Sequence, residues 1–333
     1  MQLEQAAARF AADLAALWPE EEREGPLGLA VSGGPDSLAL MLLAHAAMPG
    51  QIAVASINHG LRPEAAVEVA LVERLARERG IPFTAMTLTP LIGNIQAQAR
   101  EGRYSSLEQW AEATGLGAVA TAHHADDQAE TLLMRLNRGS GLPGLAGVRA
   151  ALRPSSGRHA LLRPLLGWRK RELEAVVAEA GITAVRDPSN TNPAFERVRV
   201  RQTLASADWL DPVQFAASAE HILEGWQALQ WYAELDWHEM VMRDDSAPGG
   251  IGYTYCANVP RVIGIETILG IIHALGGKAT RAEAARAWDR LWAGENASLG
   301  GVLARAGVEK VEKVGVPMRV WRFRPEPARG SVN

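Results

Sequence analysis

The stretch "GLAVSGGPDSLALMLLAHAA", residues 28–47, is the most informative part of this chain. It opens with an apolar run, closes with a helical pattern, and places two glycines, a proline, two serines and an aspartate between them. At a junction from strand to helix, Gly33 and Gly34 let backbone amides approach a ligand closely, and the helix start offers donors to an anion. Ser32 and Ser37 add hydroxyl groups. We therefore interpret this loop as a phosphate cradle.

Asp36 is the unexpected residue of the loop. The loop has neither the lysine of a Walker motif nor the GxGxxG spacing. A carboxylate beside bound phosphates repels them unless a divalent cation lies between. Asp36 therefore predicts Mg²⁺ held jointly by its carboxylate and by phosphate oxygens. The alternative is that Asp36 only caps the helix.

The segments around this loop alternate between two patterns. Apolar runs of strand length occupy residues 27–31, 52–57, 81–88 and 117–124, and helical patterns occupy residues 37–47, 64–79, 95–114 and 126–137. Strands that alternate with helices predict an α/β fold with a doubly wound parallel sheet. Such sheets bind ligands at the carboxyl ends of their strands. The polar segments SGGPDS, NHGLR and HHADDQAE all follow strand ends.

Composition limits the remaining classes. The 333 residues are 47% hydrophobic with a formal charge of -4, which predicts two or three globular domains and argues against a uniformly basic coat. Cys256 is the single cysteine, so an intramolecular disulfide and a CxxC metal site are excluded. The first residues lack a signal-peptide pattern, and no apolar run reaches membrane-span length. We expect a cytoplasmic protein without a membrane partner; a homodimer stays open.

Several motifs in order carry a family resemblance. They are SGGPDS (32–37), NHGLR (58–62), AREGRY (99–104), HHADDQAETLLMRLNRGSG (123–141), RPLL (163–166) and DPSN (187–190). Together they resemble the tRNA(Ile)-lysidine synthetases of the PP-loop (N-type) ATP pyrophosphatase superfamily, over residues 25 to about 204. The chain departs from the family pattern at Val198, where the family usually has Asn.

The resemblance implies a two-step ligase reaction. ATP, with Mg²⁺, adenylates the C2 oxygen of the wobble cytidine in the CAU anticodon of tRNA(Ile). Free L-lysine then displaces AMP to form lysidine, which changes codon reading from AUG to AUA. The implied catalytic residues are Asp36, Arg103, Asp127 and Glu130, and the implied nucleotide contacts are Ser32, Gly33, Gly34, Asp36, Ser37, His59 and His123.

The HHADDQAE segment contains the candidate lysine contacts. Asp127 and Glu130 lie three residues apart on a predicted helix, so they share one face and can hold an ammonium group. The alternative is that acidic residues simply favour a helix N-terminus. His123 and His124 lack the spacing of a zinc site, and we expect His123 to contact phosphate. For His59, the alternative to an ATP contact is a role in the turn.

A basic run follows this helix. Residues 135–171 contain nine basic side chains and no acid. Such a run neutralises RNA phosphates, although a solvated surface is the alternative. The candidate tRNA contacts are Arg138, Arg153, Arg158, Arg169, Arg197 and Arg201.

The rest of the chain differs in charge and pattern. Residues 204–250 contain nine acids and one base with helical spacing of apolar residues, and the last segments combine helices with alternating strands. We expect a PP-loop catalytic domain at 1–204, a helical acidic domain or linker at 205–250, and a small α+β domain at 251–333. Two other functions stay open: a PP-loop tRNA thiolase, and a non-catalytic module that binds ATP or RNA.

Overall fold

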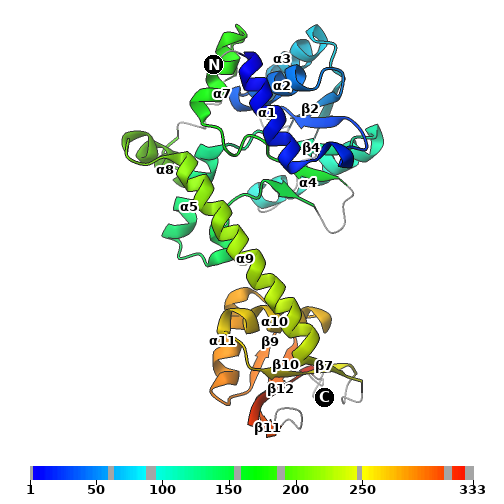
Figure 1. The fold of residues 1–333 in the computed structure, drawn as a ribbon, viewed down its shortest axis with the longest axis vertical. Coiled ribbons are helices and arrows are strands. Elements are labelled where there is room, and N and C mark those ends of the chain that lie inside the picture. The colour runs from blue at the N-terminus through cyan, green and yellow to red at the C-terminus, as the bar shows by residue number, and fades with distance from the viewer. Residues whose placement is uncertain are drawn as a thin grey trace, which may run out of the picture. The chain divides into compact units, whose positions relative to one another are not determined.

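The chain forms two compact units. The computed structural model describes residues 3–58, 64–87, 95–153, 159–185, 192–245, 250–310 and 317–326. Contacts within the chain divide it into unit 1, Met1–Leu223, and unit 2, Glu224–Asn333 (Figure 1). The boundary falls inside the 29-residue helix α9 (Pro212–Met240). The three-part division expected from the sequence stays a prediction.

Unit 1 is built on a six-stranded sheet. Its strands are β1 (Leu27–Ala30), β2 (Ile52–Asn58), β3 (Phe83–Thr87), β4 (Ala118–Ala120), β5 (Ala151–Leu152) and β6 (Ala160–Leu162). They lie in the order β3-β2-β1-β4-β6-β5. All neighbouring pairs are parallel except β5 with β6. The predicted α/β fold with a parallel sheet is confirmed.

The strand order has one functional consequence. From β1 the chain proceeds to β2 and β3 on one side, and then returns to place β4 on the other side of β1. The order therefore reverses between β1 and β4. In open parallel sheets, ligands bind in the crevice at this reversal, beyond the carboxyl ends of the strands. The loops that follow β1 and β4 are SGGPDS and HHADDQAE.

Helices cover both faces of this sheet. The helices of unit 1 that precede α9 are α1 (Leu3–Leu17), the short 3-10 helix η1 (Glu20–Glu22), α2 (Pro35–Ala47), α3 (Glu64–Glu78), α4 (Ile95–Thr114), α5 (Ala125–Asn137), α6 (Leu142–Leu145), α7 (Lys170–Glu179) and α8 (Glu196–Ser206). Residues of α1, α2, α3 and α7 share one core cluster with the strands, and residues of α4 form another with the opposite face. Among the described helices, none combines the length and the apolar character that a membrane crossing requires.

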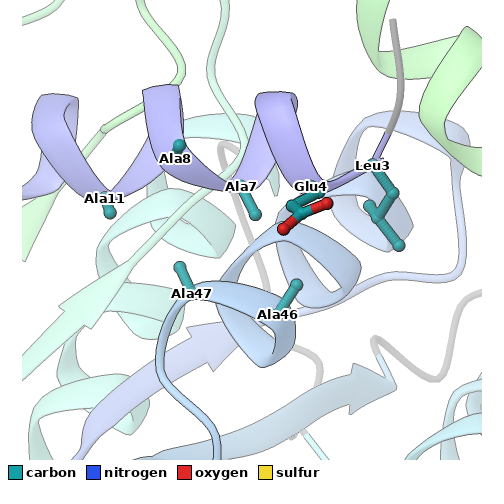
Figure 2. A pocket seen from close by; sticks show the side chains of 7 residues that line it. All are labelled: Leu3, Glu4, Ala7, Ala8, Ala11, Ala46 and Ala47. Carbon is teal, nitrogen blue, oxygen red and sulfur yellow. The ribbon is translucent and has the colours of Figure 1, made fainter.

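A recess lies between α1 and α2 (Figure 2). Its lining residues are Leu3, Glu4, Ala7, Ala8, Ala11, Ala46 and Ala47. Ala46 and Ala47 end α2, whereas Asp36 lies in the first turn of that helix. At a rise of about 1.5 Å per residue, the two ends are about 16 Å apart along the helix axis. The recess is therefore separate from the predicted phosphate loop.

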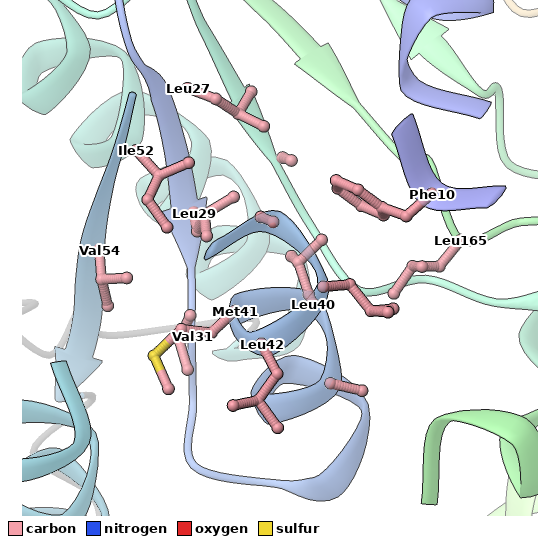
Figure 3. Close-up of a cluster of buried hydrophobic side chains, with 14 of the residues drawn as sticks. Phe10, Leu27, Leu29, Val31, Leu40, Met41, Leu42, Ile52, Val54 and Leu165 are labelled. Atoms are coloured by element: carbon pink, nitrogen blue, oxygen red, sulfur yellow. The ribbon is translucent and has the colours of Figure 1, made fainter. Parts of the chain in front are cut away.

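The central strand explains the apolar pattern of the opening stretch. Leu27 and Leu29 of β1 are fully buried in the core cluster that includes Leu40 of α2 and Phe10 of α1 (Figure 3). Gly28 faces the opposite side, where an added Cβ atom would lie 2.7 Å from the ring of Trp110. Because β1 packs helices on both faces, it anchors the start of α2 and hence the loop between them.

Unit 2 contains an antiparallel sheet and two helices besides the end of α9. Its further elements are β7 (Val241–Asp244), β8 (Gly252–Ala257), α10 (Arg261–Ala274), α11 (Arg281–Trp292), β9 (Ala297–Leu299), β10 (Val302–Arg305), β11 (Val308–Lys310) and β12 (Pro317–Pro325). The strands lie in the order β7-β8-β12-β10-β9, and β11 also pairs with β12. Trp288 of α11 packs where Gly264 of α10 has no side chain. The expected helices and late strands are present.

Some local predictions differ from the structure. The strand expected at 117–124 ends at Ala120, and the next residues run into α5. The pair β5 and β6 was not predicted, because both strands are very short and lie within the basic run.

Candidate active site

The loop after β1 is closed by its own hydrogen bonds. The backbone N–H of Ser32 donates to Ser37 Oγ at 3.1 Å, and Ser37 Oγ donates to the carbonyl oxygen of Gly34 at 2.9 Å. Gly33 has a φ of 87°, a conformation that side chains rarely adopt, so glycine is required there. Gly34 is the N-cap of α2 and Pro35 is the first residue of that helix. The loop therefore holds the first turn of α2, and its unpaired amides, at the carboxyl end of β1.

Asp36 has the chemistry that a magnesium ion requires. Its Oδ1 atom is buried and has no hydrogen-bond partner within the described ranges, and its Oδ2 atom lies 3.5 Å from His124 Nε2. Mg²⁺ in nucleotide sites is commonly held by one or two carboxylates together with phosphates and water. In the part of the chain that the structure describes, no group of three or more metal-binding side chains forms a complete site. Asp36 therefore fits an ion that takes its other ligands from phosphate and water.

His124 connects the two loops. It is buried, and its ring nitrogens lie 3.5 to 3.7 Å from carboxylate oxygens of Asp36, Asp126 and Asp127. Burial alone would lower the pKa of His124, but the contact with Asp36 and the surrounding negative charges raise it above its usual value. His123 bonds instead through Nδ1 to Thr121 Oγ1 at 2.9 Å. His124 thus joins the carboxylates that follow β1 and β4.

One face of α5 forms a charged network with α8. Glu130, only 1% exposed, accepts hydrogen bonds from Arg197 Nε at 2.6 Å and from Arg201 Nε at 2.6 Å. Asp127 accepts from Arg197 Nη2 at 2.8 Å. Burial would raise the pKa of Asp127, but the charges of His124 and Arg197 lower it below its usual value. The network keeps charged groups close to the phosphate loop.

This network joins residues for which separate roles were predicted. Asp127 and Glu130 were expected to hold lysine, and Arg197 and Arg201 were expected to contact tRNA. In the structure the four side chains are mutual partners. Both roles stay predictions. In either role, the substrate must bind side chains that are already paired, or must replace one partner of a pair. Val198, which replaces the Asn of the family pattern, is buried.

Other positions of α5 hold neighbouring segments, and sequence reasoning missed them. Gln128 is buried, donates to Val148 O at 2.7 Å and accepts from Val148 N at 2.7 Å. Arg135 donates to Gly147 O at 3.1 Å, and Asp126 accepts from Lys170 N at 2.8 Å. The signal for the first two was their i, i+7 spacing, which puts both on one helix face.

Three arginines of the basic run are paired with acids from other parts of the chain. Arg138 pairs with Glu196 and Arg153 with Glu22. Arg169 pairs with Asp211 at 3.1 Å. Exposed ion pairs contribute only about 0–1 kcal/mol, so a phosphate group can replace such a partner. Arg163, a member of the run, is instead buried and donates to Arg149 O at 2.5 Å.

Three predicted residues have no side-chain description. His59 and Arg158 lie outside the described residues, as does the DPSN motif at 187–190. Arg103 lies within α4, but its side chain is also outside the described set. Their roles stay predictions from the sequence.

The chain is similar in sequence to a known family and to known proteins. Residues 4–207 match the family described as "PP-loop domain". A tRNA(Ile)-lysidine synthase of Novosphingobium aromaticivorans is 45% identical over 328 residues, covering 98% of this chain and 95% of the relative. A tRNA(Ile)-lysidine synthase of Zymomonas mobilis is 35% identical and covers 92% of this chain and 90% of the relative.

A solved structure supports the fold. The U34-tRNA thiolase NcsA from Methanococcus maripaludis, with its [4Fe-4S] cluster, is similar with a TM-score of 0.55 and 15% identity. The match covers 67% of this chain and 80% of the thiolase, and at this identity it concerns the fold alone. The sheet order, the loop after β1 and the full-length similarity together show that the chain belongs to the PP-loop domain family and, within it, to the tRNA(Ile)-lysidine synthases.

Proposed function

We propose that this chain is an ATP-dependent ligase that converts the wobble cytidine of tRNA(Ile) to lysidine, with L-lysine as the second substrate. One observation carries the proposal. In a chain 45% identical to a lysidine synthase over nearly its whole length, the SGGPDS loop and the acidic start of α5 meet where the sheet order reverses. His124, which lies 3.5 Å from Asp36 and 3.6 Å from Asp127, marks that meeting point.

The first step is adenylation of the base. The C2 oxygen of cytidine attacks the α-phosphorus of ATP, a P–O bond forms, and pyrophosphate leaves. Ser32, Gly33, Gly34 and Ser37 are proposed to hold the phosphates through the loop and the start of α2. The buried Oδ1 atom of Asp36 is proposed to hold Mg²⁺. When bound, the ion neutralises charge on the phosphates.

The second step replaces AMP by lysine. The ε-nitrogen of lysine attacks C2, a C–N bond forms, the C2–O bond breaks, and AMP leaves with the bonding electrons. The attacking amine must first lose a proton, so a nearby acceptor is required. Asp127 is our candidate for holding the lysine ammonium, because its pKa is held below the usual value and its carboxylate stays ionised. The same lowered pKa makes Asp127 a weak base, so we propose that water takes the proton. Glu130 and Arg103 complete the proposed catalytic set.

The tRNA is proposed to lie across unit 1. Arg138 and Arg153 have side chains that are 60% and 66% exposed, and both make only exposed ion pairs. Arg158, Arg169, Arg197 and Arg201 are the other proposed contacts, and His59 and His123 are proposed to contact ATP. Phosphate contacts of this kind give affinity without reading sequence. We place the reaction in the cytoplasm, and a homodimer stays an open expectation.

The thiolase alternative is less favoured by the residues. Cys256 is the single cysteine of the sequence, and it is buried in β8 of unit 2. Burial raises the pKa of its thiol, which lowers its reactivity. A sulfur-transfer reaction that relies on protein cysteines has no second thiol in this chain.

Mass spectrometry of nucleosides tests the proposal. Unmodified tRNA(Ile) with a CAU anticodon is incubated with the protein, ATP, Mg²⁺ and lysine, and the digested nucleosides are analysed. We expect lysidine to form only when both ATP and lysine are present. A parallel reaction with Cys256→Ser should give the same product. Binding of ATP or tRNA with neither pyrophosphate release nor a modified base would support the non-catalytic module. A thiolated nucleoside formed when a sulfur donor replaces lysine would support the thiolase.

A further inference from the structure

Phe195 occupies a position that neither capping nor burial explains. It is the N-cap residue of α8 and makes no side-chain capping bond. N-cap positions favour Ser, Thr, Asp and Asn, because their side chains satisfy free backbone amides. The ring is also 46% exposed, so it contributes little to the core. A residue that breaks both local rules is a candidate for function.

The backbone that carries Phe195 is held on both sides. Its N–H donates to Asn192 O at 3.2 Å, and its carbonyl oxygen accepts from Val198 N at 3.1 Å. Arg199 Nη1 donates to the carbonyl oxygens of Pro193 and Ala194 at 2.9 and 3.1 Å. These hydrogen bonds order the turn before a ligand binds, so binding at the ring costs little backbone entropy.

The neighbours of Phe195 along the chain connect it to the site and to basic side chains. Glu196 pairs with Arg138, and Arg197 bonds Asp127 at 2.8 Å and Glu130 at 2.6 Å. The ring is therefore two residues from an arginine that contacts the proposed lysine-binding carboxylates. An exposed aromatic ring that is followed in the sequence by arginines at 197, 199 and 201 is a combination that suits single-stranded nucleic acid, which proteins bind by stacking and by charge.

We propose that Phe195 is a base-stacking residue for the anticodon loop. This inference rests on the proposed function and names a contact that it requires. Lysine must approach C2 across a face of the cytosine ring, and stacking on neighbouring bases covers these faces, so the cytidine must be unstacked before it reacts. A base next to the cytidine stacks on Phe195 and thereby leaves the stack of the loop, which exposes the cytidine. Arg138 and Arg197 then lie near the phosphates of the loop backbone. The proposal concerns RNA affinity and leaves ATP binding unchanged.

The test compares four substitutions in the full chain. Phe195→Ala removes the ring, Phe195→Leu keeps apolar volume without a π face, and Phe195→Tyr keeps the face. Trp231→Ala, which removes a 58% exposed aromatic side chain of unit 2, is the matched control. The dissociation constant is measured for an RNA hairpin with a CAU anticodon loop, and ATP affinity and thermal unfolding are measured in parallel.

Stacking contributions predict the pattern. The Ala and Leu variants should bind the hairpin about 5- to 100-fold more weakly, and the Tyr variant and the Trp231 control should bind like the wild type. ATP affinity and the unfolding midpoint should stay the same. If the Leu variant binds as tightly as the wild type, Phe195 acts only as an apolar group or not at all, and the proposal is wrong. If the wild type itself does not bind the CAU hairpin, the proposed function fails instead.

Discussion

Each unit buries a carboxylate of one of its helices, and the two carboxylates differ in their hydrogen-bond partners. Glu130 of unit 1 is 1% exposed and is bonded by the guanidinium groups of Arg197 and Arg201. Asp236 of unit 2 is 5% exposed and accepts from two hydroxyl groups, those of Tyr255 at 2.6 Å and Thr267 at 2.7 Å. The first carboxylate has full counter-charges, whereas the second has none among these partners.

The difference in partners predicts that substitutions of the two carboxylates have different effects. A charge that is buried with counter-charges can remain ionised beside a reaction centre. For Asp236, burial raises the pKa of the carboxyl above its usual value, although the hydrogen bonds from Tyr255 and Thr267 oppose the rise. We therefore expect substitutions in the carboxylates of unit 1 to change activity and the substitution of Asp236 to change only stability.

The largest expected effect is that of Asp36→Asn. The substitution removes the charge of a carboxylate whose buried Oδ1 atom has no hydrogen-bond partner among the described residues, so no described bond is lost at that atom. Loss of a strong electrostatic stabiliser should lower adenylation at least about 100-fold. The measurement is pyrophosphate release with tRNA present. Asp236→Asn is the control and should retain activity; near-normal activity of the Asp36 variant would reduce this residue to a helix cap.

An intermediate effect is expected for Glu130→Gln and Asp127→Asn. Glu130→Gln leaves Arg197 and Arg201 without their shared charge and should destabilise unit 1 by about 1–3 kcal/mol, below the cost of a fully buried pair because the arginines are partly exposed. Asp127→Asn affects one of the arginines and should cost less. Both variants should still form adenylated tRNA but need more lysine in the second step.

A chase experiment separates the two steps for these variants. Label from α-labelled ATP is trapped on the tRNA, and lysine is then added. Persistence of the label after the lysine chase would agree with a role in the second step. If neither variant forms adenylated tRNA while both bind lysine normally, the carboxylates belong to the nucleotide site, and lysine must bind elsewhere.

The smallest effect is expected for Asp236→Asn and depends on pH. Because the pKa of Asp236 is raised in the folded state, the folded chain holds the proton more tightly than the unfolded chain. The resulting stabilisation is complete below the unfolded pKa of about 4 and is lost as the pH rises through the folded-state pKa. Removal of the titrating group should abolish this dependence and change stability by about 1 kcal/mol or less at pH 7.

Hydrogen exchange of α10 amides measures this effect in unit 2 alone. Asp245→Asn, which changes an exposed carboxylate in the same unit, is the matched control. The wild type and the control should lose protection as the pH rises from about 4 through the raised pKa of Asp236, and Asp236→Asn should not. A wild type whose protection rises with pH from this point would contradict a raised pKa for Asp236.

Much of unit 1 was predictable because its signals are local. The apolar run of β1, the glycines of the loop and the helical pattern of α2 are contiguous, and each element follows from the residues within it. The charged residues Asp127 and Glu130 were correctly expected on one helix face, since spacing along a helix fixes direction. The short strands β5 and β6 were missed because two or three residues carry no period.

Local sequence patterns were enough to predict the parallel α/β class, the glycine-rich loop after β1 and the acidic start of α5. The partners of these segments depend on long-range packing. Glu130 and Arg201 are 71 residues apart, and Gln128 reaches Val148 across 20 residues. The position of α8 beside α5, which places Arg197 and Arg201 on Glu130, depends on how two complete elements pack. Periodicity shows which face of a helix is polar, but the element that packs against this face is set by long-range contacts that no local pattern encodes.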